Sequence, residues 1–229
     1  MEKMLSRKTT LKTADVEGLL EILQETATAH AQLWHCGREE MLRDYHCVWM
    51  IVRTWVGLYE PLSPGELELR TWTCPPKRGV SRREFDLFSG GRRVGEAVQG
   101  WILADVTTRR IRNIAMVQPL VEAACSGEEK PVKLRRPALP EDLAVLGNVE
   151  VRAEDIDGNG HLNNAHYPRY ALSVLPGRTL RQMLISYSRE CFVGDIIQIQ
   201  GKTQGDQAWL RGCVDGHDSF AIQAEFFPE

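Results

Sequence analysis

The chain of 229 residues has no run of apolar residues long enough to cross a bilayer, no apolar segment near its start and little excess of charge. Lys and Arg number 28 against 31 Asp and Glu, so the net charge of −3 gives no general attraction to nucleic acid or anionic membranes. A membrane span needs about 18 or more consecutive apolar residues, and a signal peptide needs an apolar core. We therefore expect a cytoplasmic protein that binds neither membrane nor nucleic acid.

Paired cysteines are also missing, since the six cysteines form no C-x-x-C motif. In a chain of this length, that pattern indicates reduced thiols rather than a disulfide framework. His35-Cys36 and His46-Cys47 do not have the spacing of a zinc finger, and free cysteine often serves as a small core residue. We expect no metal and no cofactor.

The sequence does contain one very polar stretch, residues 155–164, which reads Asp-Ile-Asp-Gly-Asn-Gly-His-Leu-Asn-Asn. It holds two carboxylates, three carboxamides and an imidazole, and its glycines permit positive φ. Its opening fits a calcium loop, but the twelfth position is His166 rather than Glu, and the residues before it alternate as a strand does. Another interpretation is a polar connection that caps a helix, with Asn163 or Asn164 as the N-cap.

The first part of the chain predicts one amphipathic helix and an antiparallel sheet. Apolar residues recur with helical spacing from Val16 to Ala27 in a helix expected to reach His30, and Asp15 is a candidate N-cap. The charged segment from Glu39 to Asp44 predicts no regular element. Strands are expected at residues 6–13, 47–59, 66–73, 81–88 and 93–104.

A proline-rich, charged segment at residues 118–143 predicts an interdomain linker. The order of elements then repeats: a strand, the polar loop, a helix and four strands at residues 145–153, 155–164, 165–174, 180–188, 195–202, 208–214 and 219–227. We predict a duplicated α+β unit, residues 1–117 and 144–229, in which each antiparallel sheet wraps around a helix. The polar loop occurs only in the second copy, so one half should supply chemistry and the other shape.

Several separated motifs resemble those of the acyl-acyl-carrier-protein (acyl-ACP) thioesterases of plants and bacteria. They are Asp157-x-Asn159-x-His161-Leu162-Asn163-Asn164, Tyr187-Ser188-Arg189-Glu190-Cys191, Thr71-Trp72, Arg82-Arg83-Glu84-Phe85-Asp86 and Trp101-Ile102-Leu103-Ala104-Asp105. Ser188 stands where the family's pattern has Arg. The resemblance covers nearly the whole chain. It implies a tandem hotdog fold and hydrolysis of fatty acyl-ACP thioesters to free fatty acid and ACP.

By resemblance, the catalytic residues are Asp157, Asn159, His161 and Glu190. A carboxylate, Glu190 or Asp157, would deprotonate water, while Asn159 and His161 would orient the water or the carbonyl. A carboxylate beside an apolar acyl tunnel would have its pKa raised toward working pH. The start of the following helix, at Asn163 and Asn164, would offer backbone N–H groups to the oxyanion.

A covalent mechanism is the alternative, because Cys191, His161 and Asn159 are the residue types of a papain-like set. It would produce an acyl-enzyme intermediate. Cys191 adjoins Glu190 on a predicted strand, where successive side chains face opposite ways, so only one of the two should face the site.

The resemblance also implies an acyl tunnel in the first half and an acidic carrier protein as partner. Weak candidates for the tunnel, each of which also fits a plain core, are Leu19, Leu23, Trp49, Ile51 and Trp72. Basic clusters available for docking are Lys77-Arg78, Arg109-Arg110 and Lys133 to Arg136. An acyl-CoA thioesterase and a non-catalytic acyl-binding module stay open as other functions. A monomer and a homodimer are both feasible, because two hotdog halves already make the pair that single hotdogs form by dimerising.

Overall fold

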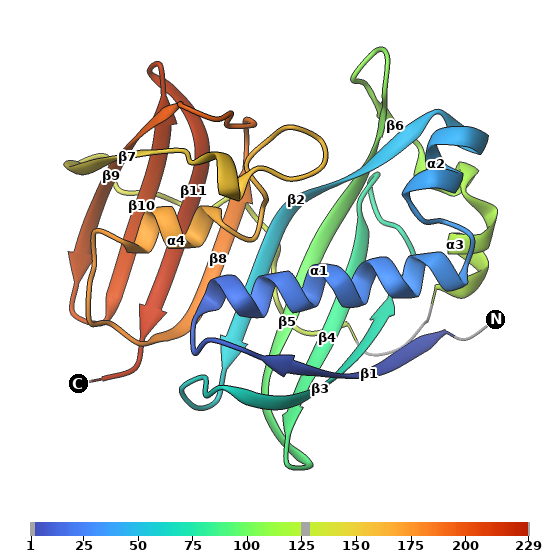
Figure 1. Cartoon of the computed structure of the whole chain (residues 1–229), viewed down its shortest axis with the longest axis horizontal. Helices are drawn as coiled ribbons and strands as arrows, with labels where there is room; N and C mark the ends of the chain where they lie inside the picture. Colours follow the sequence, from blue (N-terminus) through green and yellow to red (C-terminus); the bar gives the residue numbers. More distant parts are fainter. Residues whose placement is uncertain (1–2, 125–128, 229) are drawn as a thin grey trace.

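The computed structural model of the chain describes residues 3–124 and 129–228. Their strands form one antiparallel sheet in the order β1-β3-β4-β5-β2-β8-β11-β10-β9-β7, with β6 paired to β5. Figure 1 shows this sheet extending through both halves, with α1 lying across the first half and α4 across the second. The halves meet where β2 pairs with β8, from Arg53 opposite Ser186 to Gly57 opposite Gln182.

The two halves repeat one topology. The strands of the first half are β1 (Met4–Leu11), β2 (Cys47–Leu58), β3 (Gly65–Thr73), β4 (Ser81–Ser89), β5 (Arg92–Asp105) and the short β6 (Ile111–Arg112). Those of the second half are β7 (Ala144–Glu150), β8 (Leu180–Tyr187), β9 (Ile196–Gln204), β10 (Gln207–Val214) and β11 (His217–Phe226). Within the sheet the strands of the first half lie in the order β1-β3-β4-β5-β2, and those of the second half lie in the matching order β7-β9-β10-β11-β8. In each half, the first, third, fourth, fifth and second strands along the chain are thus neighbours in that order. The repeat seen in the sequence is therefore a repeat of strand order.

The long helix α1 (Val16–Leu33) follows the apolar spacing and continues past the predicted end at His30. Asp15 caps it, because the carboxylate accepts the N–H of Gly18 at 2.8 Å. Its buried face consists of Val16, Leu19, Leu20, Ile22, Leu23, Thr26, Ala27 and His30. Each large apolar side chain on this face contributes about 1.5–3 kcal/mol by burial against the sheet.

The helix of the second half is shorter than the predicted residues 165–174. α4 contains only Tyr167–Leu172, with Pro168 in its first turn. The residues before it form a separate turn, in which His166 donates its N–H to the carbonyl of Asn163 at 2.9 Å. No helix in the described ranges 3–124 and 129–228 is both long and apolar enough to span a membrane.

Two helices lie where none was expected. α2 (Arg38–Tyr45) occupies the charged segment, and α3 (Gln118–Ala123) follows the short 3-10 turn Ile114–Met116 at the start of the expected linker. They share a second apolar cluster, formed by Trp34, Cys36, Met41, Cys47, Leu103, Ile114, Val117, Leu120 and Ala123. Few apolar residues in each segment reach this cluster, so helical periodicity was too weak to reveal them. Residues 125–128 of the expected linker, including Cys125, lie outside the described residues.

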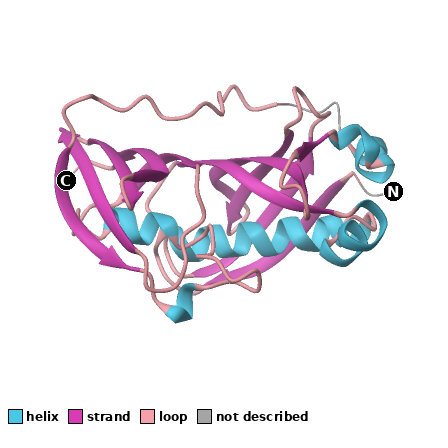
Figure 2. Ribbon diagram, turned by 90° about the horizontal axis from the view of Figure 1, so that it is seen from above, coloured by secondary structure: helices cyan, strands magenta, loops and turns pink. Residues whose placement is uncertain are grey.

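The rest of the linker, from residue 129, lies across the face of the sheet opposite the helices, as Figure 2 shows. Arg82 donates to the carbonyls of Lys130 and Val132 at 2.7 Å each. The Lys130 ammonium lies 2.6 Å from the Asp86 carboxylate, and Arg136 lies 2.5 Å from Asp218. The linker is therefore fixed to the sheets of both halves, and it covers the outer face of β4.

Candidate active site

The polar loop folds back on itself as a tight turn. Ile156 pairs with Leu162 in an isolated antiparallel bridge, and the N–H of Asp157 donates to the carbonyl of His161 at 2.8 Å. Gly160 has a φ of +84°, which favours glycine at this position, and donates to the Asp157 carbonyl at 3.0 Å. The turn thus holds His161 and Asp157 at its two ends.

Asp157 and Asn159 are bonded to each other within this turn. One carboxylate oxygen of Asp157 accepts the backbone N–H of Asn159 at 2.7 Å, and the other accepts its side-chain Nδ2 at 3.1 Å. Asn159 is exposed. The carboxylate of Asp157 is therefore occupied in orienting the Asn159 carboxamide. No side-chain hydrogen bond or ion pair among the described residues joins this pair to His161 or Glu190.

Glu190 reaches the same place from a second loop. The predicted strand at Glu190 and Cys191 is wrong, because β8 ends at Tyr187 and the chain then leaves the sheet. The two loops are joined where Leu162 donates its N–H to the Cys191 carbonyl at 2.8 Å. As a result, Nε2 of His161 lies 3.4 Å from Oε2 of Glu190, and the ring of Phe192 stands edge-on to the imidazole, 5.3 Å between centroids.

Cys191 has the opposite environment from its neighbour Glu190. Its side chain is fully buried in the second-half core, and its N–H donates to the Tyr167 hydroxyl at 3.1 Å. Burial raises the pKa of the Cys191 thiol, which disfavours the thiolate that a nucleophile needs. As expected, the side chains of Glu190 and Cys191 point in opposite directions, although the two residues lie in a loop and not in a strand.

We expect Cys191→Ala to keep most of the turnover of the wild type, because the buried thiol packs in the core. The measurement is the rate of thiol release, with Cys213→Ala, another buried cysteine, as the control for general loss of packing. Near-complete loss in Cys191→Ala alone, with an acyl adduct on the wild-type protein in mass spectra, would establish the covalent mechanism instead.

The prediction that Asn163 or Asn164 directly caps the helix is wrong. His166 is the N-cap residue of α4, and Asn163 Oδ1 accepts the N–H of Ala165 at 3.1 Å in the preceding turn. Asn164 uses its carbonyl to accept the Tyr187 hydroxyl at 3.0 Å. Because α4 has only six residues, its dipole is smaller than expected. Pro168 in the first turn has no backbone N–H, so the start of the helix also offers one N–H donor fewer. An oxyanion role for this turn stays a prediction.

Arg109 is a site residue that the sequence suggested only as part of a docking cluster. It lies in the turn between β5 and β6, in left-handed conformation with a φ of 58°. Asp105 shapes that turn by accepting the N–H groups of Thr107 and Thr108 at 3.1 and 2.8 Å. Nη2 of Arg109 lies 3.7 Å from Oε2 of Glu190, so the first half supplies a cation beside the carboxylate of the second. The sequence identified no partner for Arg109, because Glu190 is 81 residues away.

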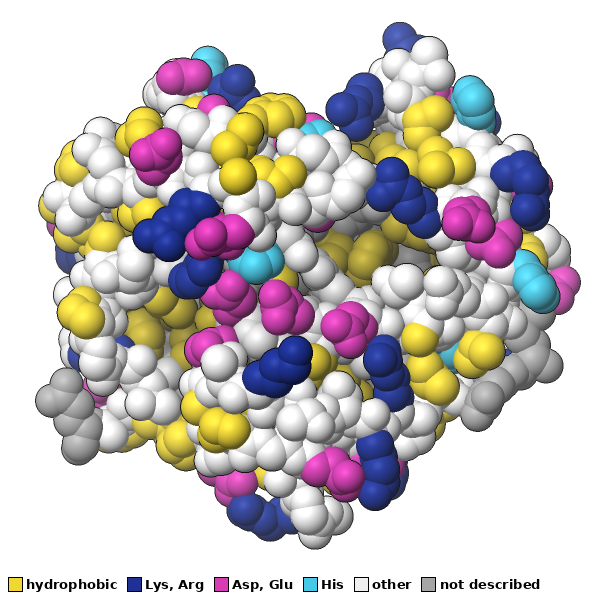
Figure 3. All heavy atoms as spheres, in the orientation of Figure 1, with side chains coloured by type: hydrophobic (Ala, Val, Ile, Leu, Met, Phe, Trp, Pro, Cys, Tyr) yellow, Lys and Arg dark blue, Asp and Glu magenta, His cyan; other side chains and the backbone are white. Residues whose placement is uncertain are grey.

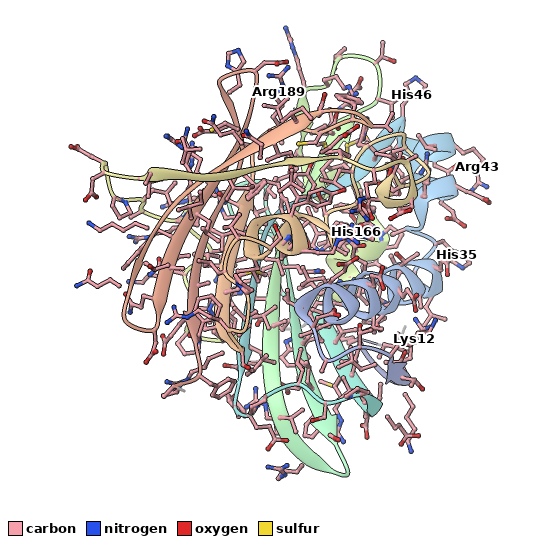
Figure 4. The ribbon with its side chains drawn as sticks, turned by 60° about the vertical axis from the view of Figure 1, so that its left-hand side comes forward. Lys12, His35, Arg43, His46, His166 and Arg189 are labelled. Carbon is pink, nitrogen blue, oxygen red and sulfur yellow. The ribbon has the colours of Figure 1, made fainter. Side chains whose placement is uncertain are left out.

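An ionic cluster ties the start of α4 to α1. Asp155 is buried at the base of the polar loop, where Arg169 Nη2 lies 2.5 Å from its Oδ1 and the Tyr170 hydroxyl donates to its other oxygen. Nδ1 of His166 lies 2.7 Å from Oε1 of Glu17, and Nε of Arg169 lies 3.1 Å from the other oxygen of Glu17. Figure 4 shows His166 between the two helices. Burial raises the pKa of Asp155, but the bonds from Tyr170 and Arg169 outweigh it and keep the pKa below its ordinary value.

A hollow with hydrophobic side chains at its bottom lies above α1 in Figure 3, between the polar loop and the β5–β6 turn. Ile51 is buried on β2, in register with Trp101, while Leu19 and Leu23 belong to the main core. Trp72 is on the other face of the sheet, with Lys130 4.8 Å above its ring, and so does not line a tunnel under α1. Trp49 packs with the second apolar cluster and donates to the Cys36 carbonyl.

The chain matches two family models in succession. Residues 6–117 match the acyl-ACP thioesterase N-terminal domain, and residues 141–224 match the C-terminal domain of the same family. An oleoyl-acyl carrier protein thioesterase of Arabidopsis thaliana is 27% identical over 210 residues, and one of Coriandrum sativum is 25% identical over 209. Both alignments cover 81% of this chain and 57% of the relative, so the chain spans little more than half the length of these curated relatives.

Solved structures show the same fold over nearly the whole chain. The 12:0-ACP thioesterase from Umbellularia californica has a TM-score of 0.86 at 17% identity, covering 100% of this chain and 99% of that one. An acyl-ACP thioesterase from Bacteroides thetaiotaomicron has a TM-score of 0.82 at 18% identity, covering 98% of each. The prediction of a tandem hotdog is confirmed by these neighbours and by the large antiparallel sheet. With both family models matched in order, this chain belongs to the acyl-ACP thioesterase family.

Proposed function

We propose that this protein hydrolyses fatty acyl-ACP thioesters to free fatty acid and ACP. The observation that supports this most directly is the pair of His161 and Glu190, 3.4 Å apart and both partly exposed. The pair lies on the polar loop and the 188–194 loop, and Figure 3 shows a hollow with hydrophobic side chains between the polar loop and the β5–β6 turn. Hydrolysis of a fatty acyl thioester needs a base that activates water and an apolar surface that holds the acyl chain. A carboxylate and an imidazole beside an apolar surface can supply both.

In this mechanism Glu190 takes a proton from water while the water oxygen attacks the thioester carbon. His161, within reach of the same carboxylate oxygen, orients the water and carries a proton between Glu190 and the reacting atoms. The carbon–sulfur bond then breaks, and the departing thiolate receives the proton. Asn159, held by Asp157, is exposed and placed to hydrogen bond the carbonyl or the water. Cys191 forms no bond to the acyl group.

The carrier protein would dock around the β5–β6 turn. Arg109 and Arg110 lie in this turn, and Arg189 follows β8 in the neighbouring loop, where Figure 4 shows it on the outside of the molecule. Ile111 and Val193 are 64% and 60% exposed, which adds apolar surface between these charges. A basic rim with apolar side chains is complementary to an acidic carrier protein. The clusters Lys77-Arg78 and Lys133 to Arg136 stay less direct candidates, because Lys77 pairs with Glu129 and Arg136 with Asp218.

The test is thiol release from matched acyl-ACP and acyl-CoA thioesters of increasing chain length, by the wild type and by His161→Ala. We expect rapid hydrolysis of carrier-protein thioesters by the wild type and near-complete loss in His161→Ala. His217→Ala, at an exposed histidine of β11, is the matched control. Preference for CoA would assign the acyl-CoA activity instead. Binding of acyl-ACP without turnover would assign the non-catalytic module.

A further inference from the structure

The Glu190 carboxylate is contacted by side chains from both halves of the chain. Its Oε2 lies 3.4 Å from Nε2 of His161, on the polar loop of the second half, and 3.7 Å from Nη2 of Arg109, on the β5–β6 turn of the first. No other group in the described ranges forms a hydrogen bond or an ion pair with this carboxylate. Both contacts therefore fall on one oxygen, and the other, Oε1, is available to water.

The β5–β6 turn fixes the backbone from which Arg109 reaches Glu190. The N–H of Arg109 donates to the carbonyl of Asp105 at 3.0 Å. The buried Asp105 carboxylate accepts Nη1 of Arg112 at 2.9 Å, in addition to the two backbone N–H groups of the turn. Val106 donates to the carbonyl of His46, the C-cap residue of α2, at 3.1 Å. The backbone around Arg109 is thus tied both within the turn and to the end of α2.

Arg109 itself has a backbone conformation that is uncommon for arginine. Its φ of 58° lies in the left-handed region, which glycine and asparagine adopt far more readily than residues with long side chains. Such conformations persist only where the surrounding structure imposes them, and they are concentrated at active sites. A glycine or an asparagine would fit this turn with less strain, so the turn alone does not account for the arginine.

The neighbouring Arg110 provides a comparison within the same turn. Arg110 is exposed, and its guanidinium forms no hydrogen bond or ion pair with any described residue. The side chain of Arg109 is also largely exposed, at 61%, yet its guanidinium lies beside Glu190. An ion pair this exposed adds little to the stability of a fold. The effect of the Arg109 contact is therefore to be sought in the site.

A second contact restricts how the Glu190 side chain can turn. This side chain starts from a loop, has several rotatable bonds and is 32% exposed, so His161 alone would leave it free to adopt other orientations. The guanidinium of Arg109, on the same oxygen, removes much of that freedom. A general base contributes only when it is held within reach of the proton that it takes, and small misplacements are costly.

We propose that Arg109 is a positioning residue of the reaction, which holds the Glu190 carboxylate beside His161 in the orientation that takes a proton from water. The inference rests on the proposed function, because it assigns Glu190 as the base. Arg109 touches neither the water nor the acyl group and acts through Glu190. The first half of the chain thus contributes to the chemistry, in contrast to the expected division in which it supplies only shape.

The test uses one acyl chain on two thiols: the carrier protein and N-acetylcysteamine, a small thiol with no protein surface to dock. We expect Arg109→Met to lower kcat for the carrier thioester and kcat/KM for the small one by about tenfold or more. Arg109→Lys, which keeps the charge, should recover part of the loss. Arg92→Met should change neither rate. It removes an ion pair of similar exposure, with Glu60, at the opposite end of β5.

The Glu190→Gln background separates positioning from other effects of the substitution. If Arg109 acts through Glu190, then Arg109→Met should cause no further loss once the carboxylate has been replaced. An equal loss in both backgrounds would mean that Arg109 acts on the substrate or on the fold directly, which overturns the proposal. A loss confined to the carrier thioester would overturn it too, because Arg109 would then serve docking alone.

Crystal structures of the wild type and of Arg109→Met test the inference without turnover. We expect the Glu190 carboxylate to lie beside His161 in the wild type, and to turn away or adopt several orientations in Arg109→Met. A Glu190 side chain that keeps its place in the variant would refute the positioning role. Failure of the wild type to hydrolyse any thioester would refute the proposed function alone, since the two structures still report on how Glu190 is held.

Discussion

Glu190→Gln is expected to lower kcat for acyl-ACP hydrolysis by about 10²–10⁴-fold, with little change in KM. The carboxamide keeps the size of the side chain and its proximity to His161, but it cannot accept a proton from water. The effect should be visible in single-turnover thiol release, where product dissociation does not limit the rate. Circular dichroism would establish that the variant retains its fold, because Glu190 is partly exposed in a loop.

Two further variants show which carboxylate acts as the base. Asp157→Asn should lower kcat less than Glu190→Gln, because both oxygens of Asp157 are engaged by Asn159. Glu150→Gln, at an exposed carboxylate of β7, should have no effect. A larger loss in Asp157→Asn than in Glu190→Gln would reverse the roles of the two residues and leave Glu190 to orient His161.

Asp155→Ala is expected to lower the free energy of unfolding by about 2–3 kcal/mol, which makes it the variant with the largest effect on stability. It removes the acceptor of the buried Tyr170 hydroxyl and the closest carboxylate to Arg169. Urea unfolding monitored by tryptophan fluorescence would measure the loss. Glu154→Ala is the matched control, because the Glu154 carboxylate is 67% exposed and pairs with the exposed Arg152 at 3.4 Å.

The same residue predicts a dependence of stability on pH. Since the folded protein holds the pKa of Asp155 below its ordinary value, the stabilisation is present above that ordinary value of 3.8. It is lost as pH falls through the lower, folded pKa, because the protonated carboxyl no longer pairs with Arg169. Between pH 5 and pH 3, Asp155→Asn should therefore lose less stability than the wild type. Parallel losses in the two proteins would show that Asp155 is not responsible.

The spacing of apolar residues was enough to predict α1 and every strand except the short β6, because each of these elements buries one face against a common core. It missed α2 and α3, whose few apolar residues pack only on the small second cluster. At the site, the resemblance to the family's motifs pointed to His161 and Glu190, and the structure brings these two residues together from loops separated by β8. The link from Arg109 to Glu190 could not be predicted, because it joins two loops whose residues are 81 positions apart in the chain. The proposed boundaries of the two domains, the roles of the site residues and the cytoplasmic location stay predictions.

The pairing of β2 with β8 places two copies of one topology in a single chain, and this frees the copies from symmetry. In a homodimer of one hotdog unit, every helix and loop occurs twice, so a change that suits one function is imposed on both subunits. Here α1 has 18 residues and α4 only six, and the polar loop exists once. A long helix can cover a deep sheet in one half while a short helix leaves space for a reactive loop in the other. Duplication within the chain thus permits a division of labour that a symmetric assembly of identical units forbids.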